Sequence, residues 1–289
     1  MTEKQLPLVG ATISVNSLPD HIDWLLADQR DLEIPEPVFT PMFDGDWSHL
    51  KLPEGFSSDI IHADWRQVVR QAKDVLDGYQ GRLSIHGPFV GMPLLAIDKR
   101  IRDVVRDRLR QALEFAQELG ATQMVLHSPW EFFGGPFLPH SSTRDRDLVI
   151  GLVVDLLGDV LPVAEQAGCT LVIEGIHDKN TAPLLALVRA FESEYVRLSI
   201  DTGHAYLTHC QGGPPPDQWV RDAGPLLAHL HLQGSDRSLD RHWAPGRGNI
   251  NWYALFEALQ ELDHTPRLIL ETAQFRDGAA WLAEHGYVR

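Results

Sequence analysis

The sequence predicts an α/β fold, a single (β/α)8 TIM barrel over residues 1–289, and three observations indicate it. Short apolar strands alternate with helical segments along the chain. The length suits one barrel of roughly 250 residues or more. Six predicted strands end in a side chain that can bind a metal ion. These are His86, His127, Glu174, Asp201, His231 and Glu271. Because barrel strands all end at one rim, the six side chains should meet at one site.

The first half of the chain follows this alternation. Residues 8–14 form the first expected strand, and Pro19 begins the helix after it. A second strand is expected over 32–39, although Pro35 and Pro37 are poorly suited to a strand interior. The later elements are a polar loop over 40–58, a helix over 61–77, a strand over 83–86, a helix over 101–119 ended by Gly120, and a strand over 124–127.

The second half continues the pattern, beginning with one helix expected over 148–167 and ended by Gly168. The remaining elements are a strand over 171–174, a helix over 182–191, a strand over 198–201, a stiff turn over 211–216, a strand ending at His231, a long loop to residue 251, a helix over 252–262 and a strand over 268–271.

A loop rich in aromatic residues, glycine and proline follows His127, over residues 129–143. A long loop on the rim of a barrel can be a lid over the site. It can equally be an aromatic plug packed over the barrel mouth, and the sequence leaves both interpretations open. Phe89, directly after another strand end, and Trp130 in this loop are both expected to contact a substrate at the rim.

The charge balance limits the classes of partner. The formal net charge is −15, with 25 Lys and Arg against 40 Asp and Glu. Such a balance disfavours nucleic acids and anionic membranes, which attract basic surfaces. The two cysteines, Cys169 and Cys210, make no disulfide framework, so a reducing cytoplasm is expected. The first residues lack an apolar signal core, and no stretch has membrane-spanning length. A soluble cytoplasmic protein is therefore expected.

Asp201 and His204 show most directly why the strand ends suggest metal chemistry. Gly203 is expected to make a sharp turn that brings the imidazole back to the carboxylate, a pair that suits Zn²⁺ or Mn²⁺. An Asp here is often only a helix N-cap, and a lone strand-end histidine is often a core residue. Six titratable strand ends in chain order favour a metal centre instead.

Other polar residues are expected near this centre. In an extended segment alternate side chains share a side, so Asp240 and His242 could hold one ion together. His229 shares a face with His231 but lies deeper, and we expect it to pack behind the site. Glu33 and Glu36 in the second strand region are expected to reach the pocket.

These residues resemble the xylose isomerase-like barrel superfamily, which includes endonuclease IV and the sugar phosphate isomerases and epimerases. The most specific segment is Asp240-Arg-His-Trp-Ala-Pro-Gly-Arg-Gly-Asn-Ile. The resemblance to endonuclease IV implies up to three metal ions held by nine residues. In this chain the nine are His86, His127, Glu174, Asp201, His204, His231, Asp240, His242 and Glu271.

The resemblance to the epimerase branch, similar to tagatose 3-epimerase, implies a smaller set. There a single metal is held by residues matching Glu174, Asp201, His231 and Glu271. In that branch the two glutamates also move a proton between the faces of the sugar. Residues matching His204 and Arg237 bind the substrate.

The sequence therefore predicts a metal-dependent isomerase or epimerase of a small sugar, sugar phosphate or polyol, acting through an enediolate with Glu174 and Glu271 as catalytic bases. One to three divalent ions are expected, of Zn, Mn, Mg or Fe. The alternative is an endonuclease IV-like phosphoesterase with several metals, acting on a small, non-duplex substrate. A non-catalytic metal-dependent binding protein is a third class. No nucleic-acid or membrane partner is expected, and a homo-oligomer stays open.

Overall fold

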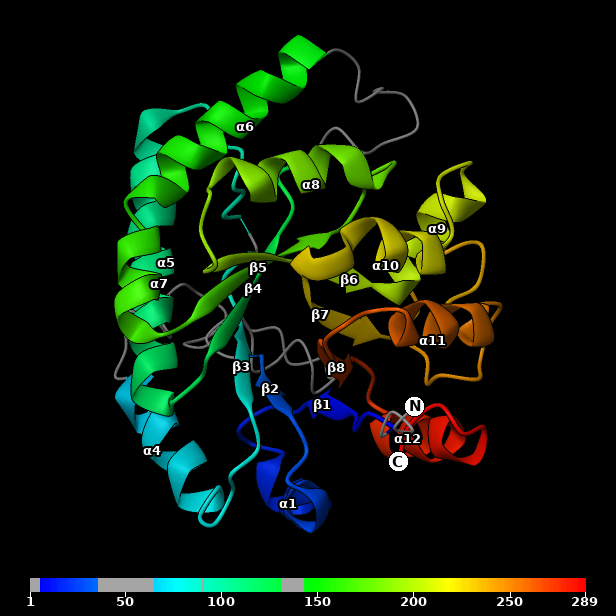
Figure 1. The fold of residues 1–289 in the computed structure, drawn as a ribbon. Helices are drawn as coiled ribbons and strands as arrows, with labels where there is room; N and C mark the ends of the chain where they lie inside the picture. The colour runs from blue at the N-terminus through cyan, green and yellow to red at the C-terminus, as the bar shows by residue number, and fades with distance from the viewer. Residues whose placement is uncertain (1–5, 36–64, 90, 131–142) are drawn as a thin grey trace.

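Eight parallel strands close into a barrel in chain order, and the helices surround it (Figure 1). The computed structural model describes residues 6–35, 65–89, 91–130 and 143–289. The strands are β1 (Gly10–Thr12), β2 (Leu32–Ile34), β3 (Leu83–His86), β4 (Gln123–His127), β5 (Thr170–Gly175), β6 (Val196–Asp201), β7 (Leu227–Leu232) and β8 (Arg267–Leu270). β8 pairs in parallel with β1, which closes the ring. The predicted (β/α)8 fold is confirmed.

Helices connect successive strands, and the last helix follows β8. They are α1 (Leu18–Asp28), α4 (Trp65–Val75), α5 (Lys99–Leu119), α6 (Thr143–Gly158), α7 (Leu161–Ala167), α8 (Thr181–Ala190), α9 (Thr202–Cys210), α10 (Pro216–Ala223), α11 (Trp252–Gln260) and α12 (Phe275–Glu284). A 3-10 turn, Gly224–Leu226, precedes β7. α5 agrees closely with the helix expected over 101–119. Asp98 caps its first turn, and Gly120 ends it in the left-handed conformation with φ of 90°.

The helix expected over 148–167 is in fact two helices. α6 ends at Gly158, and α7 begins at Leu161 with Pro162 in its first turn. Pro162 has no backbone N–H, and its ring would clash with the carbonyl of Gly158 in a continuous helix. The break separates the two helices because proline is tolerated in a first turn and not in a helix interior. The apolar periodicity of the segment does not reveal this break.

Several expectations fall partly outside the described residues. The strand expected over 32–39 ends at Ile34, and the described structure stops at Pro35. The polar loop over 40–58, Glu36 and the first residues of the helix expected over 61–77 lie outside it. So do residues 131–142, which means that the choice between a lid and a plug is not tested.

The core consists of buried apolar side chains from the strands and from the facing sides of the helices. The chain ends also meet, because the Arg289 N–H donates to the Pro7 carbonyl at 3.1 Å. Both cysteines are free thiols, with Cys169 buried and Cys210 exposed. Among the described residues, no helix combines the length and the apolar character needed to cross a membrane.

Candidate metal centre

The register of the parallel strands brings the predicted ligands to one end of the barrel. His127 on β4 lies opposite Glu174 on β5, and Asp201 on β6 lies opposite His231 on β7. Glu271 directly follows β8. Because the side chains of strand-end residues at the same level point into the same barrel mouth, their convergence follows from this register.

The innermost group joins β5, β6, β7 and the end of β8. Nδ1 of His231 lies 3.3 Å from Oε1 of Glu174 and 3.4 Å from Oε2 of Glu271. One ligand atom each from Glu174, Asp201 and His231 lies within 4.8 Å of the other two. Two ligands bound tetrahedrally at roughly 2.1 Å from an ion are about 3.4 Å apart. The spacing of the inner group therefore suits one divalent ion.

Three buried atoms in and beside the inner group test whether a metal fits. Nδ1 of His231, Nδ1 of His204 and Oε2 of Glu174 have no hydrogen-bond partner among the described residues. Buried polar atoms are nearly always hydrogen-bonded, so three unpaired ones in one place require an explanation. A divalent cation in the inner group would satisfy the atoms of His231 and Glu174, because imidazole nitrogens and carboxylate oxygens are good ligands for Zn²⁺ and Mn²⁺. Nδ1 of His204 is left for a second ion or for a substrate hydroxyl.

Two further groups adjoin the inner one. Nε2 of His204 and Nε2 of His242 lie 3.2 and 3.0 Å from Oδ2 of Asp240. This trio is closer to solvent than the inner group. On the other side, Nε2 of His86 is 4.0 Å from Oε2 of Glu174, and the rings of His86 and His127 are 5.1 Å apart. Eight of the nine residues singled out from the sequence thus lie in three contiguous groups, each with the ligand types and spacing for an ion. The ninth, Glu271, adjoins the inner group through its 3.4 Å contact with His231.

Burial and opposing charges set the protonation of the ion-free centre. Burial raises the pKa of Glu271 to about 7, against the opposing charges of His231 and His242. Burial alone would lower the pKa of His242, but the charge of Glu271 and the hydrogen bond to Asp240 raise it to about 10. Burial lowers the pKa of His86 to about 4, so its imidazole is neutral at pH 7. Burial disfavours the charged form of His204 and His231 too, but the surrounding carboxylates raise the pKa of both well above the ordinary value. Protons on these two histidines and on His242 therefore balance the carboxylates.

A comparison with known protein families identifies the family of this chain. A family model described as a xylose isomerase-like TIM barrel matches residues 43–285. The chain belongs to this family. The resemblance drawn from the sequence is confirmed.

Sugar epimerases are among the curated relatives of this xylose isomerase-like chain. The D-psicose 3-epimerase of Agrobacterium fabrum is 28% identical over 153 residues, which cover 51% of this chain and 48% of the epimerase. The match thus spans about half the length of that relative. The 3-dehydro-D-guloside 4-epimerase of Escherichia coli is 24% identical, with 61% of this chain and 69% of the enzyme covered.

Solved structures of low identity share the barrel. A D-tagatose 3-epimerase-like protein superposes with a TM-score of 0.70 at 18% identity, covering 96% of both chains. A Thermus thermophilus protein soaked with ZnCl2 gives a TM-score of 0.65 at 23% identity, covering 97% of this chain and 99% of its own. At these identities the similarity shows a common fold.

Gln233 is a residue of the centre that the sequence did not suggest. Its buried amide nitrogen donates to Oδ1 of Asp201 at 3.1 Å and to Oδ1 of Asp240 at 2.7 Å. Its amide oxygen accepts from the backbone N–H of His242 at 2.7 Å. One side chain thus links the inner group to the outer one. The signal was available, since Gln233 comes two positions after His231 and alternate residues share a face.

The sharp turn expected at Gly203 is not there. α9 begins directly after Asp201, whose Oδ1 accepts from the backbone N–H of His204 at 2.7 Å, and Gly203 lies inside the first turn of the helix. Asp201 is therefore an N-cap as well as a predicted ligand. Gly203 serves close packing instead, because a Cβ there would lie 2.6 Å from Cδ of Gln233.

Replacing Gly203 by alanine is expected to destabilise the protein by roughly 1–3 kcal/mol, the usual cost of overpacking a buried site. The added methyl group would displace the Gln233 amide from its partners, so binding of Zn²⁺ should weaken as well. Gly151→Ala in α6 is the control, because that Cβ meets nothing within 4 Å and alanine favours a helix by up to about 1 kcal/mol. Urea unfolding measures both variants, and equal stabilities would contradict the packing role.

Phe89 and Trp130 differ in their relation to the centre. The Phe89 ring stacks on His127 at 4.1 Å between centroids and lies 5.0 Å from His86. Trp130 is buried, and its backbone N–H donates to Oγ of Ser128 at 3.2 Å. Phe89 thus covers two predicted ligands. Contact of either ring with a substrate stays a prediction.

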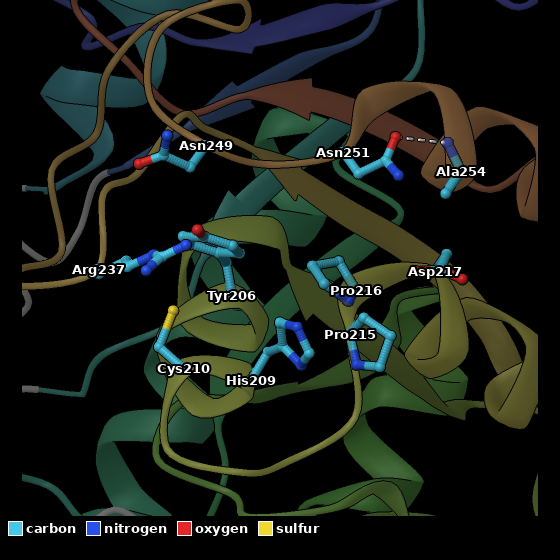
Figure 2. A pocket seen from close by; sticks show the side chains of 10 residues that line it. All are labelled: Tyr206, His209, Cys210, Pro215, Pro216, Asp217, Arg237, Asn249, Asn251 and Ala254. Atoms are coloured by element: carbon cyan, nitrogen blue, oxygen red, sulfur yellow. Dashed lines mark hydrogen bonds between the residues drawn. The ribbon is translucent and has the colours of Figure 1, made fainter.

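Arg237 lies in a different cavity from Glu271. Figure 2 shows it beside Tyr206 and Cys210 of α9, in a cavity of about 530 Å³ that Asn249 and Asn251 also line. Glu271 and His242 line another cavity, of about 640 Å³. The spacing from His231 gave the position of Arg237 but not the direction of its side chain in the loop. The structure does not bring this residue to the centre, and its contact with a substrate stays a prediction.

Two arginines that were given no role from the sequence do line the cavity of Glu271. They are Arg241 and Arg247, whose guanidinium carbons lie 5.3 and 4.3 Å from the centre of the Trp243 ring. Both come from the Asp240-Arg-His-Trp segment and its continuation. Arg241 is paired with Asp236 at 2.9 Å, so the positive charge on this side of the mouth comes mainly from Arg247.

Proposed function

We propose that this protein is a divalent-metal-dependent isomerase or epimerase of a small carbohydrate. The observation that carries the proposal is the convergence of two glutamates from different strands, Glu174 and Glu271, within 3.4 Å of the same His231 nitrogen. Glu271 also lines a cavity of about 640 Å³, large enough for a sugar. The similarity to a psicose epimerase and to a 3-dehydro-guloside epimerase supports the substrate class.

In this proposal Glu174, Asp201, His231 and Glu271 hold the ion, whose role is Lewis-acid polarisation of the substrate carbonyl. The remaining chemistry belongs to the side chains. One glutamate removes the proton beside the carbonyl to give the enediolate, and the other returns a proton to the opposite face. His204, whose Nδ1 lies 3.4 Å from Oε1 of Glu174, would hold a substrate hydroxyl. Because these four residues are buried, water would be kept away from the enediolate, which it would otherwise quench.

Solvent exchange tests the proposed reaction. The protein loaded with Mn²⁺ is incubated with ketoses and inososes in deuterated water, and mass spectrometry measures deuterium at the carbon beside the carbonyl. We expect exchange with at least one sugar. No exchange with any of them, together with hydrolysis of a phosphodiester, would contradict the isomerase proposal.

A second candidate function is hydrolysis of a small phosphoester, because two additional ligand groups adjoin the inner one. These are the trio of His204, Asp240 and His242, and the trio of His86, His127 and Glu174. Ions held by these groups would supply an activated water as the nucleophile for hydrolysis. The acidic chain disfavours duplex DNA as the substrate.

Counting the bound metal tests the second candidate. We expect protein saturated with Zn²⁺ to hold more than one ion per chain, because each of the three groups has the spacing of a site. Elemental analysis of desalted protein gives the number, and His242→Ala should lower it. His264→Ala is the control, since that ring hydrogen-bonds the backbone carbonyl of Leu227, at the opposite end of β7 from His231. A limit of one ion would remove the main support for the hydrolase.

A further inference from the structure

Glu33 is a buried carboxylate inside the barrel that belongs to none of the predicted ligand sets. It comes from β2, is fully buried, and lies across the interior from β7. Its Oε1 is 2.9 Å from Nε2 of His231, a residue 198 positions away. Its Oε2 is 3.2 Å from Nε2 of His229 and accepts from Oγ of Ser84, also at 3.2 Å. Burying a carboxylate costs free energy unless the group is paired, and these contacts with two histidines and a serine offset that cost.

The contact with Glu33 decides which nitrogen of His231 carries a hydrogen. An ionised carboxylate only accepts hydrogen bonds, so Nε2 of His231 must donate. In the neutral ring the lone pair is then on Nδ1, the atom that lies 3.3 and 3.4 Å from Glu174 and Glu271. A lone pair between two carboxylates is repulsive unless a cation lies among them. The hydrogen bond from Nε2 to Glu33 therefore leaves Nδ1 of His231 able to bind a metal ion.

His229 and Ser199 hold Glu33 in place from behind. Nδ1 of His229 is 2.8 Å from Oγ of Ser199, and the His229 ring meets the His231 ring edge-on at 4.7 Å between centroids. His229, Ser199 and Glu33 are all fully buried. The carboxylate thus lies between two buried imidazoles, hydrogen-bonded to Nε2 of His231 and 3.2 Å from Nε2 of His229.

We infer that Glu33 is a positioning residue, which orients His231 so that Nδ1 binds the metal ion and which increases the affinity of the centre for that ion. The inference rests on the proposed metal-dependent function. A carboxylate that accepts from the far nitrogen of a ligating imidazole fixes the ring and makes it a better donor. Loss of such a partner typically lowers metal affinity by 10- to 100-fold.

The test is the affinity of Glu33→Gln for Zn²⁺, measured by competition with a chelating dye. Glutamine keeps the shape but removes the charge, so we expect Zn²⁺ to bind about 10- to 100-fold more weakly, with an unchanged number of ions per chain. Asp31→Asn is the matched control. Asp31 lies two positions earlier, just before β2, but pairs with Arg82 at 2.6 Å instead of with a histidine. Its loss should leave the affinity for Zn²⁺ unchanged.

A second readout reports the geometry directly. In long-range ¹H–¹⁵N spectra of the Zn²⁺-loaded protein, His231 should be bound through Nδ1 and carry its hydrogen on Nε2. If Glu33→Gln does not fold, Glu33→Asp replaces it. Aspartate keeps the charge but is one methylene shorter, so it withdraws from Nε2 of His231 and should also weaken binding.

Failure of the inference about Glu33 can be distinguished from failure of the proposed function. Wild-type affinity in Glu33→Gln and in Glu33→Asp would overturn the inference and leave the proposed function intact. Loss of one whole ion, with the affinity for the others unchanged, would also overturn it, because Glu33 would then be a ligand together with His229 and His231. A wild-type protein that binds no Zn²⁺, Mn²⁺ or Fe²⁺ would overturn both this inference and the metal dependence of the proposed function.

Discussion

Replacement of Glu271 by glutamine is expected to lower turnover by about a hundredfold or more, within the range of general-base catalysis. Glutamine keeps an oxygen near His231 and the shape of the side chain, but it cannot accept the substrate proton. The binding of Mn²⁺ should weaken much less than turnover falls. The initial rate of deuterium exchange at saturating sugar measures the effect.

Glu261→Gln is the control for this variant. Glu261 is an exposed glutamate that pairs with Arg221 on the barrel surface, so its loss should change turnover little. The double variant Glu174→Gln, Glu271→Gln should show no exchange above the rate without enzyme. Exchange at the wild-type rate in that double variant would exclude proton transfer by these two residues.

Removal of the metal is expected to abolish exchange and to lower the unfolding temperature. Without an ion, the carboxylates of Glu174, Asp201 and Glu271 lie close together in a buried site. An ion that binds only the folded state stabilises it by about 2.7 kcal/mol at a hundred times its dissociation constant. Dialysis against a chelator, followed by calorimetry and by the exchange assay with and without added Mn²⁺, measures both effects.

The variant Asp201→Asn separates the role of Asp201 as N-cap of α9 from its role as a predicted metal ligand. Asparagine caps a helix about as well as aspartate, so α9 should persist. The variant should nevertheless gain little stability from Mn²⁺, because a charged ligand is missing. Full activity in protein shown by elemental analysis to be free of metal would eliminate the metal from the proposed reaction.

The strand ends illustrate what a sequence can predict. His127, Glu174, Asp201 and His231 each follow a short apolar run, and parallel strands that start and stop together must deliver their last residues to one rim. The repetition of this pattern, and not any one residue, indicates the barrel and its site. The end of α5 at Gly120 was predictable for a related reason, since local backbone preference decides it.

Local pattern was less informative where two effects compete. Apolar periodicity continues through residues 148–167, but Pro162 divides the segment into α6 and α7. At Gly203 the sequence suggested a turn, whereas Asp201 begins a helix there and the glycine makes room for Gln233. Pro162 breaks the helix through its own ring, which apolar periodicity does not register. The conformation at Gly203 depends on Gln233, a residue that the local pattern does not contain.

The sequence by itself determined the (β/α)8 fold and the set of residues that gather at the rim, because strand period and parallel register act over a few residues at a time. Only the tertiary structure decided which atoms meet. Glu33 reaches His231 across 198 residues, Gln233 joins Asp201 to Asp240, and Arg237 turns into a different cavity from Glu271. Side-chain direction in a loop and contacts across a barrel depend on packing between distant segments, which no short-range pattern encodes.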